Sequence, residues 1–124
     1  MKPPITDTIA SLLNTSRLNL IDACLEAVQN SQSVFTRLYP DSARSAATHA
    51  DAMRSAGVNL SPLAGLPVSI KDLLDVAGET TLAGSTVLQG AAAATTDAPV
   101  VARLRAAGAA IIGKTNMTEF AYSG

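Results

Sequence analysis

The sequence predicts an α/β fold on three observations. Apolar residues up to Gly57 recur at intervals of three to four, as they do on one face of a helix. From Ser61 the pattern changes to short apolar runs separated by glycine, proline and threonine, which is typical of strands and loops. Near the end of the chain a helical segment, a glycine and a fully apolar run follow one another, as in the second half of a β-α-β unit.

The first helix is predicted from a stripe formed by Leu18, Ile21, Leu25 and Val28, with Ser16 as its N-cap. Burial of this stripe would attach the helix to the rest of the fold. The single cysteine, Cys24, cannot form an intrachain disulfide, and its place in the helix favours a small buried hydrophobe.

A second, alanine-rich helix follows the apolar run Val34 to Tyr39 and the helix-starting Pro40, and Gly57 ends it. His49 lies on this helix without a second histidine or cysteine placed as a co-ligand, so we expect no metal site.

The second half of the chain begins with a short strand, Leu66 to Lys71, and a long turn-rich segment through Ser85. Asp97 is expected to cap a helix with Pro99 in its first turn and with Val100, Val101 and Leu104 on its apolar face. Gly108 would end this helix. Ala109 to Ile112 then form a strand of the kind that is buried on both faces of a parallel sheet.

Residues Gly108 to Thr115 also match the phosphate-loop pattern of a glycine, four residues and Gly-Lys-Thr. A phosphate loop must follow a strand and open a helix, whereas this stretch follows a helix and includes two β-branched residues. We therefore favour a strand over a nucleotide site, in which Lys114 and Thr115 would contact phosphate and magnesium.

Lys71 is the candidate for chemistry, because a lysine held away from water at the end of an apolar strand favours its neutral form and can accept a proton. Its spacing alone favours a simpler interpretation, a surface ion pair with Asp72 or Asp75, since most lysines are solvated.

Four blocks in order and with matching spacing change this weighting. They are LAGLPVSIKDLLDVAG (63–78), TTLAGS (80–85), DAPVVARLRAAG (97–108) and GKTNMTEF (113–120). Together they resemble the amidase signature family. The resemblance implies an incomplete mixed sheet flanked by helices, with a helical N-terminal arm at 1–60 and the start of the α/β core at 61–124. It also implies hydrolysis of a carboxamide C–N bond, in which the lysine at position 71 acts as general base of a triad with two serines, one following a cis peptide.

The same resemblance suggests roles for other residues near the site. Ser85, Ala121 and Tyr122 would contact the substrate, with a core role for Tyr122 as an open alternative, and Gly84 would be the small residue of a turn at the reaction centre. Asp72 and Asn116 would be structural, Asn116 by orienting the turn after the last strand. Glu119 would be a buried hydrogen-bonding group and Phe120 a core residue.

Both serines of the family mechanism lie downstream of the GKTNMTEF block, in a serine-rich segment that these residues do not include. Ser69, Ser85 and Ser123 are not in that context, so none is assigned as nucleophile. We expect a fragment of a longer enzyme, inactive by itself.

The remaining expectations concern partners and location. A net charge of −1 without a basic face argues against direct binding of nucleic acid. Met1 to Ile9 lack signal-peptide features, and no apolar run is long enough for a membrane span, so we expect a cytoplasmic protein. We expect a small-molecule amide substrate and no metal or cofactor, and a homodimer of the full-length parent stays open. Two alternatives also stay open: the A subunit of a tRNA-dependent amidotransferase, and a non-catalytic module that binds through an exposed sheet edge.

Overall fold

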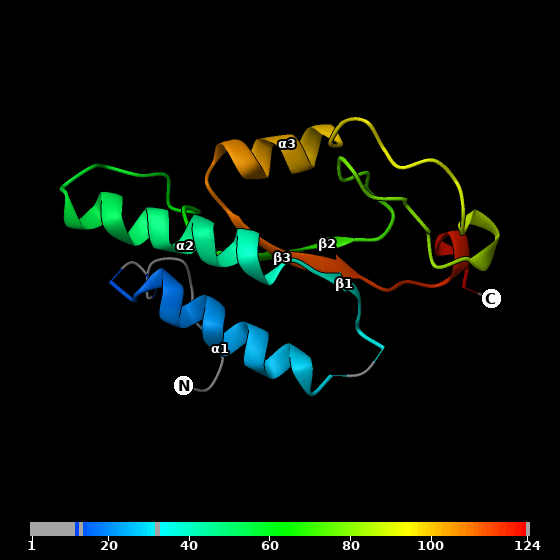
Figure 1. Cartoon of the computed structure of the whole chain (residues 1–124), viewed down its shortest axis with the longest axis horizontal. Helices are drawn as coiled ribbons and strands as arrows, with labels where there is room; N and C mark the ends of the chain where they lie inside the picture. Colours follow the sequence, from blue (N-terminus) through cyan, green and yellow to red (C-terminus); the bar gives the residue numbers. More distant parts are fainter. Residues whose placement is uncertain (1–11, 13, 32, 124) are drawn as a thin grey trace.

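A computed structural model describes residues 12, 14–31 and 33–123 of the chain (Figure 1). The segment Met1 to Ile9, on which the absence of a signal peptide was argued, lies outside these residues. The elements in chain order are α1 (Arg17–Gln29), β1 (Phe35–Leu38), α2 (Pro40–Ser55), β2 (Pro67–Lys71), the 3-10 helix η1 (Thr86–Leu88), α3 (Pro99–Ala106), β3 (Ala110–Thr115) and the 3-10 helix η2 (Glu119–Ala121).

The three strands form one sheet in the order β1-β3-β2, so β3 is the central strand. β3 runs parallel to β2 and antiparallel to β1, and α3 is the crossover between the two parallel strands. Five of the six residues of β3 are buried. The predicted α/β class, the strand at the Leu66–Lys71 run and the buried strand near the chain end are confirmed.

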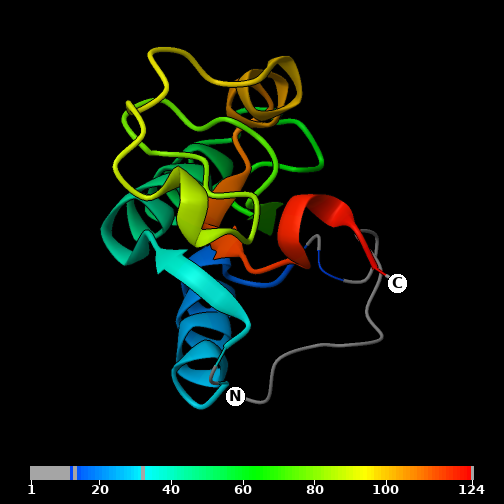
Figure 2. The same ribbon diagram turned by 90° about the vertical axis from the view of Figure 1, so that its right-hand side faces the viewer.

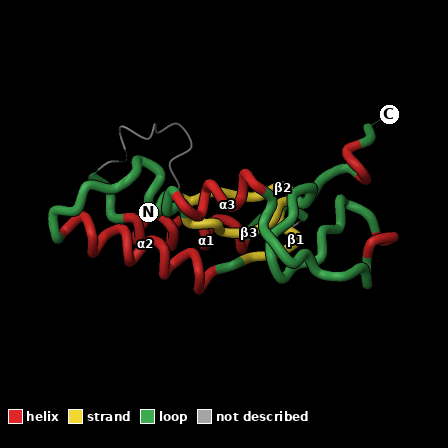
Figure 3. Tube along the Cα trace, turned by 90° about the horizontal axis from the view of Figure 1, so that it is seen from above, coloured by secondary structure: helices red, strands yellow, loops and turns green. Residues whose placement is uncertain are grey.

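Helices cover both faces of the sheet, with α1 and α2 on one face and α3 on the other (Figures 1 and 3). On the first face, Ile21 and Leu25 of α1 and alanines of α2 pack against Ala110 and Ile112 of β3. On the second face, Val101 of α3 packs with apolar residues of β2 and β3. Since residues before and after position 60 share the first core, both halves of the chain depend on β3.

The prediction that the chain is helical up to Gly57 is wrong at β1. Phe35 pairs with Thr115 and Leu38 with Gly113, which makes these residues an edge strand of the sheet. Three of the four side chains of β1 are exposed, so the strand carries no alternating apolar pattern that the sequence could reveal. The division of the chain at residue 60 stays a prediction.

Two expectations for α3 also need correction. Its N-cap is Ala98 rather than Asp97, and Val100 is exposed while Val101 is fully buried. The Asp97 carboxylate instead accepts hydrogen bonds from the Ala77 amide (2.8 Å) and from Arg105 Nε (2.9 Å). These interactions, the first above all, lower the pKa of Asp97. Because Pro99 has no N–H, the first turn of α3 has one donor fewer to cap.

The N-terminus of α1 is held by a carboxylate from α2. Ser16 is the N-cap as predicted, accepting from the Asn19 amide. Its hydroxyl donates to Asp51 (3.0 Å), which also accepts from the amides of Arg17 (2.8 Å) and Leu18 (3.0 Å). Partial burial acts to raise the pKa of Asp51, but these hydrogen bonds outweigh it and hold that pKa below its usual range.

Three further features concern single residues and the described chain as a whole. Cys24 is partly buried, and burial raises the pKa of its thiol. His49 is exposed, and no group of three potential metal ligands occurs within residues 12, 14–31 and 33–123. In the same residues no helix combines the length and the apolar character required to cross a membrane.

We predict that Asp51→Ala lowers the free energy of unfolding by about 1 to 2 kcal/mol, because three donors at the start of α1 lose their acceptor. Since the folded-state pKa of Asp51 is depressed, its contribution is full above the ordinary carboxyl pKa of about 4 and is lost as the pH falls further. Urea unfolding of both proteins at neutral and acidic pH measures this difference.

The matched control is Asp22→Ala, which removes a carboxylate whose only described partner is Arg44 in an exposed ion pair. Such pairs contribute about 0 to 1 kcal/mol. Equal losses in the two variants, or a loss at Asp51 that does not shrink in acid, would contradict the capping role.

Candidate active site

The candidate site lies where the parallel strands β2 and β3 end. In open α/β sheets, ligands bind at the carboxyl ends of the strands. η1 and η2 lie at this end of the molecule, together with most of the long loops (Figures 2 and 3). The resemblance placed all of its site residues in the segments that meet here.

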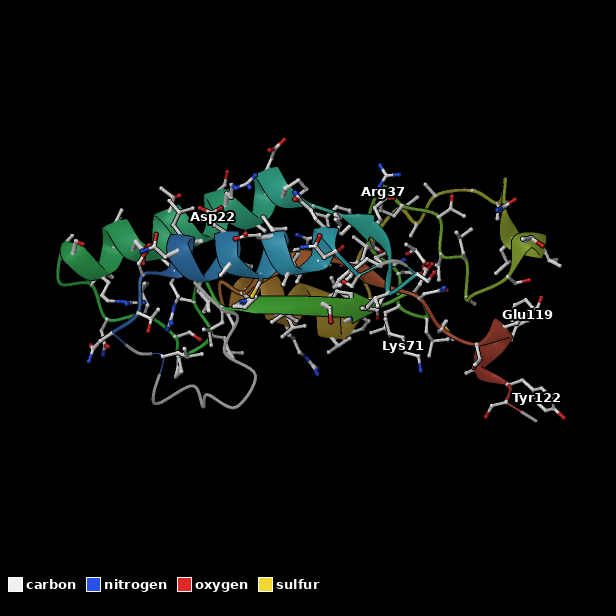
Figure 4. The ribbon with its side chains drawn as sticks, turned by 90° about the horizontal axis from the view of Figure 1, so that it is seen from below. Asp22, Arg37, Lys71, Glu119 and Tyr122 are labelled. Carbon is white, nitrogen blue, oxygen red and sulfur yellow. The ribbon has the colours of Figure 1, made fainter. Side chains whose placement is uncertain are left out.

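Lys71 is the last residue of β2 and is exposed, with its side chain extending away from the sheet (Figure 4). The described residues therefore do not keep it away from water. The surface ion pair with Asp72 or Asp75 is not formed, because the described part of the chain offers Lys71 no carboxylate within ion-pair distance. Asp75 accepts from the hydroxyl of Thr81 instead (2.7 Å).

Asp72 points into the fold and pairs with Lys114 of β3. The distance from Lys114 Nζ to Asp72 Oδ1 is 2.9 Å, and each side chain is only 2% exposed. The approach lacks the angles of a directed hydrogen bond, so we describe the contact as an ion pair. The second partners of Asp72 are distant: the Leu82 amide at 3.3 Å and the Thr36 hydroxyl at 3.4 Å.

The backbone of Asp72 makes two further connections. Its N–H donates to the carbonyl of Thr115 (2.9 Å), and its carbonyl accepts from the amide of Ala83 (2.9 Å). Asp72 thus links β2, β3, β1 and the loop after β2. This placement supports the structural role expected of Asp72, which stays a prediction.

Sequence reasoning did not identify Lys114 as the partner of Asp72. It considered Lys114 only as a phosphate-loop lysine, an interpretation that fails because the four residues before Gly113 lead into and form β3. The available signal was a lysine that continues a fully apolar strand, since a buried charge requires a counter-ion.

A cavity of about 320 Å³ adjoins the ion pair between β1 and the loop after β2. Arg37 and Glu79 line it and form an ion pair of 3.3 Å, in which Arg37 is 63% exposed. One buried and one exposed pair of opposite charges therefore line the cavity.

Tyr39 packs against the apolar core between α3 and the sheet, and burial raises the pKa of its hydroxyl to about 12.

The segments before η1 and around η2 are joined by hydrogen bonds. The Phe120 amide donates to the carbonyl of Ala83 (2.8 Å), and the Ser85 hydroxyl donates to Glu119 (2.5 Å). The same hydroxyl accepts from the amide of Val87 (3.2 Å). Ser85 is buried, so the hydroxyl that was predicted to contact substrate is engaged on both sides.

Gly84 allows these two segments to approach. Its φ is +70°, and a Cβ at this position would overlap the carbonyl oxygen of Met117 and crowd the backbone of Thr118. The close backbone approach inferred for Gly84 is thus to the segment that precedes η2.

The end of the chain differs from expectation at Glu119 and Phe120. Glu119 is exposed, although it is hydrogen-bonded to Ser85, and Phe120 is 54% exposed. Both had been expected to be buried, but η2 is a single short turn over which no described element packs. Ala121 and Tyr122 are exposed, and Tyr122 lies at the same end of the molecule as Lys71 (Figure 4).

Asn116 lies in the turn after β3 and forms hydrogen bonds within this turn and to the segment before β1. Its side-chain oxygen accepts from the Met117 amide (2.9 Å), and its side-chain amide donates to the carbonyl of Ser33 (3.4 Å). These contacts support the orienting role expected of Asn116, which stays a prediction.

Comparison with known proteins agrees with this arrangement. The sequence model of the Amidase family matches residues 19–124. The chain is 48% identical, over 99 residues, to the A subunit of glutamyl-tRNA(Gln) amidotransferase of Rhodopirellula baltica, covering 80% of the chain and 20% of that protein. It is 41% identical, over 114 residues, to the AtzE subunit of 1-carboxybiuret hydrolase of Pseudomonas sp. strain ADP, covering 87% and 25%.

Among solved structures, the peptide amidase of Stenotrophomonas maltophilia superposes with a TM-score of 0.79 at 32% identity, over 94% of this chain and 26% of that one. The mixed α/β fold and these matches define one class of protein: the chain belongs to the amidase signature family. It spans about a fifth to a quarter of the length of these two curated relatives.

We predict that Gly84→Ala separates the two joined segments, because its Cβ cannot fit against the Met117 carbonyl. Amide hydrogen exchange of Phe120, whose N–H is bonded to Ala83, should accelerate at least about tenfold, the equivalent of about 1.4 kcal/mol.

Gly90→Ala is the control, since Gly90 also has a positive φ (+86°) but no atom within 4 Å of an added Cβ. If both variants exchange the Phe120 amide at the same rate, the backbone contact at Gly84 is not what holds η2.

Proposed function

We propose that the full-length protein hydrolyses a carboxamide C–N bond, with Lys71 as the general base. Family membership supports this reaction class, and the observation that carries the assignment is Lys71 at the end of β2 without a carboxylate partner among the described residues. The base would draw a proton through a bridging serine from a nucleophilic serine, which attacks the amide carbonyl. Backbone N–H groups would stabilise the oxyanion, and its collapse would break the C–N bond, with the departing nitrogen taking the proton and leaving as ammonia or an amine. Water would then attack the acyl-serine, release the acid and return a proton to the serine.

The alternative base, Lys114, is less suited to this step. A base needs a free amine to accept a proton, and the Lys114 amine is engaged by the Asp72 carboxylate at 2.9 Å. Lys114 is also only 2% exposed, so a serine would have no path to it. Lys71 has neither restriction.

The proposal requires that other residues of the protein cover Lys71 and supply both serines. β2 is an edge strand of the described sheet, and Ser69 and Lys71 are exposed on it. An added layer on this edge would exclude water from the amine, which favours its neutral form.

Ala121 and Tyr122 are proposed to line the acyl pocket, since both are exposed at the end of the molecule that holds Lys71. Ser85 is also proposed to contact the substrate. Its hydroxyl is already bonded to Glu119 and Val87, so this contact would be made by its position in the wall of the acyl pocket and not by a free hydroxyl. A cytoplasmic location, a cofactor-free reaction and a homodimer also stay predictions.

A second candidate function is supported by the 48% identity to the A subunit of a glutamyl-tRNA(Gln) amidotransferase. In that case the protein would be one subunit of a larger enzyme. The family match is equally compatible with both functions, and the similarity to a peptide amidase and to a subunit of a hydrolase supports the first.

We predict that Lys71→Ala lowers kcat/KM for amide hydrolysis by about a thousandfold, the range expected for loss of a general base. The assay is ammonia or amine release by the full-length protein at neutral pH. Ser69→Ala is the control, because Ser69 is exposed on the same strand two residues away. Undiminished turnover by Lys71→Ala would exclude this residue as the base.

Purification of the tagged full-length protein from its own cells distinguishes the two candidates. The hydrolase predicts turnover of a simple carboxamide by the isolated protein, without ATP. Co-purifying subunits, together with amide formation on charged tRNA that requires ATP, would favour the second function.

A further inference from the structure

Lys71 and Asp72 are neighbours in the chain but have opposite environments. Lys71 is exposed to solvent, whereas the Asp72 side chain is buried inside the fold against Lys114; we call this the inner side. Successive side chains of an extended segment point to opposite sides, which separates the two charges. If Asp72 were not directed away from Lys71, it would be the nearest counter-ion available to that lysine.

Lys114 is the group that keeps Asp72 on the inner side. A buried carboxylate without a cation is strongly unfavourable, and the remaining partners of Asp72 are two neutral donors at 3.3 and 3.4 Å. These bonds are too long to replace the ion pair. Without Lys114, the carboxylate would gain free energy by moving toward water, where Lys71 is the adjacent cation.

Other carboxylates at this end of the molecule are also engaged. Asp75 accepts from Thr81, Glu79 pairs with Arg37 of β1, and Glu119 of η2 accepts from Ser85.

α1 also contacts β2, and its acidic residues are exposed: Asp22 is paired with Arg44, and Glu26 faces solvent. Among the carboxylates that the structure describes, Asp72 is therefore the one whose position decides whether Lys71 has a counter-ion.

We infer that Lys114 is a positioning residue for the base: by holding Asp72 inside the fold, it leaves Lys71 without a counter-ion among the residues that the structure describes. The inference rests on the proposed function and adds to it a determinant of the charge of Lys71. A nearby carboxylate favours the ammonium form of a lysine, so withholding Asp72 makes the neutral, proton-accepting amine easier to reach.

The test is the pH dependence of kcat/KM in the full-length protein carrying Lys114→Met. The rising limb, along which the base loses its proton, should move to higher pH by about one unit. At neutral pH, kcat/KM should fall about tenfold through kcat and recover at higher pH. In Asp72→Asn/Lys114→Met the midpoint should return to its original position, because asparagine cannot act as a counter-ion.

Three variants complete the design. Lys114→Arg keeps the cation and should keep the midpoint. Lys114→Gln still offers a donor to Asp72 and carries the same test where the methionine variant does not fold. Arg103→Met removes an exposed cation of α3 that pairs with no carboxylate among the described residues, and it should leave the midpoint unchanged.

A purely structural role of Lys114 would lower the amount of folded enzyme and leave the midpoint in place. An unshifted midpoint in Lys114→Met or Lys114→Gln, or an equal shift in the double variant, would overturn the inference. Retained hydrolysis by Lys71→Ala is a different outcome, since it rejects the proposed base itself.

Discussion

The ion pair between Lys114 and Asp72 lies where the three strands and the loop after β2 meet. Lys114 is the last residue but one of the central strand, and Asp72 follows the parallel edge strand and contacts β1 and the loop at Leu82 and Ala83. Removing one member of such a pair is far more costly than removing both, because the remaining charge stays buried. The pair therefore fixes how the ends of the strands are arranged relative to one another.

As a consequence, two lysines at the same end of neighbouring strands have different environments. Lys114 pairs across the sheet with Ile70, and Lys71 pairs with Thr115, so the two lysines are one register position apart. One is buried and neutralised by Asp72, and the other is exposed and unpaired within the described chain. A charged, structural lysine beside an uncompensated one is an arrangement that general-base chemistry can use.

The elements that could be predicted from the sequence were those with strong local signals. Helix α1, its Ser16 cap and the apolar run of β3 each depend on neighbouring residues, and all three were located correctly. Within the predicted stripe of α1, Leu18 is only partly buried, and Leu20, which the stripe omitted, is fully buried. β1 could not be found because its side chains are mostly exposed and it exists through pairing with β3, about eighty residues away.

The candidate site shows the same limit. The sequence motifs located Lys71, Asp72, Gly84 and Asn116, and the structure brings their segments to one end of the sheet. The motifs did not reveal that Asp72 turns inward to Lys114 or that the Ser85 hydroxyl is bonded to Glu119. Both contacts join residues more than thirty positions apart, so no local pattern encodes them.

The most direct test of this account is NMR of the side-chain ammonium groups in protein labelled with ¹⁵N-lysine; the 124 residues contain three lysines, Lys2, Lys71 and Lys114. The account predicts an ammonium signal that exchanges slowly with water, correlates with the Asp72 carboxyl carbon and is assigned to Lys114. A correlation between Lys71 and the Asp72 carboxyl carbon, or a Lys114 signal without that correlation, would contradict it.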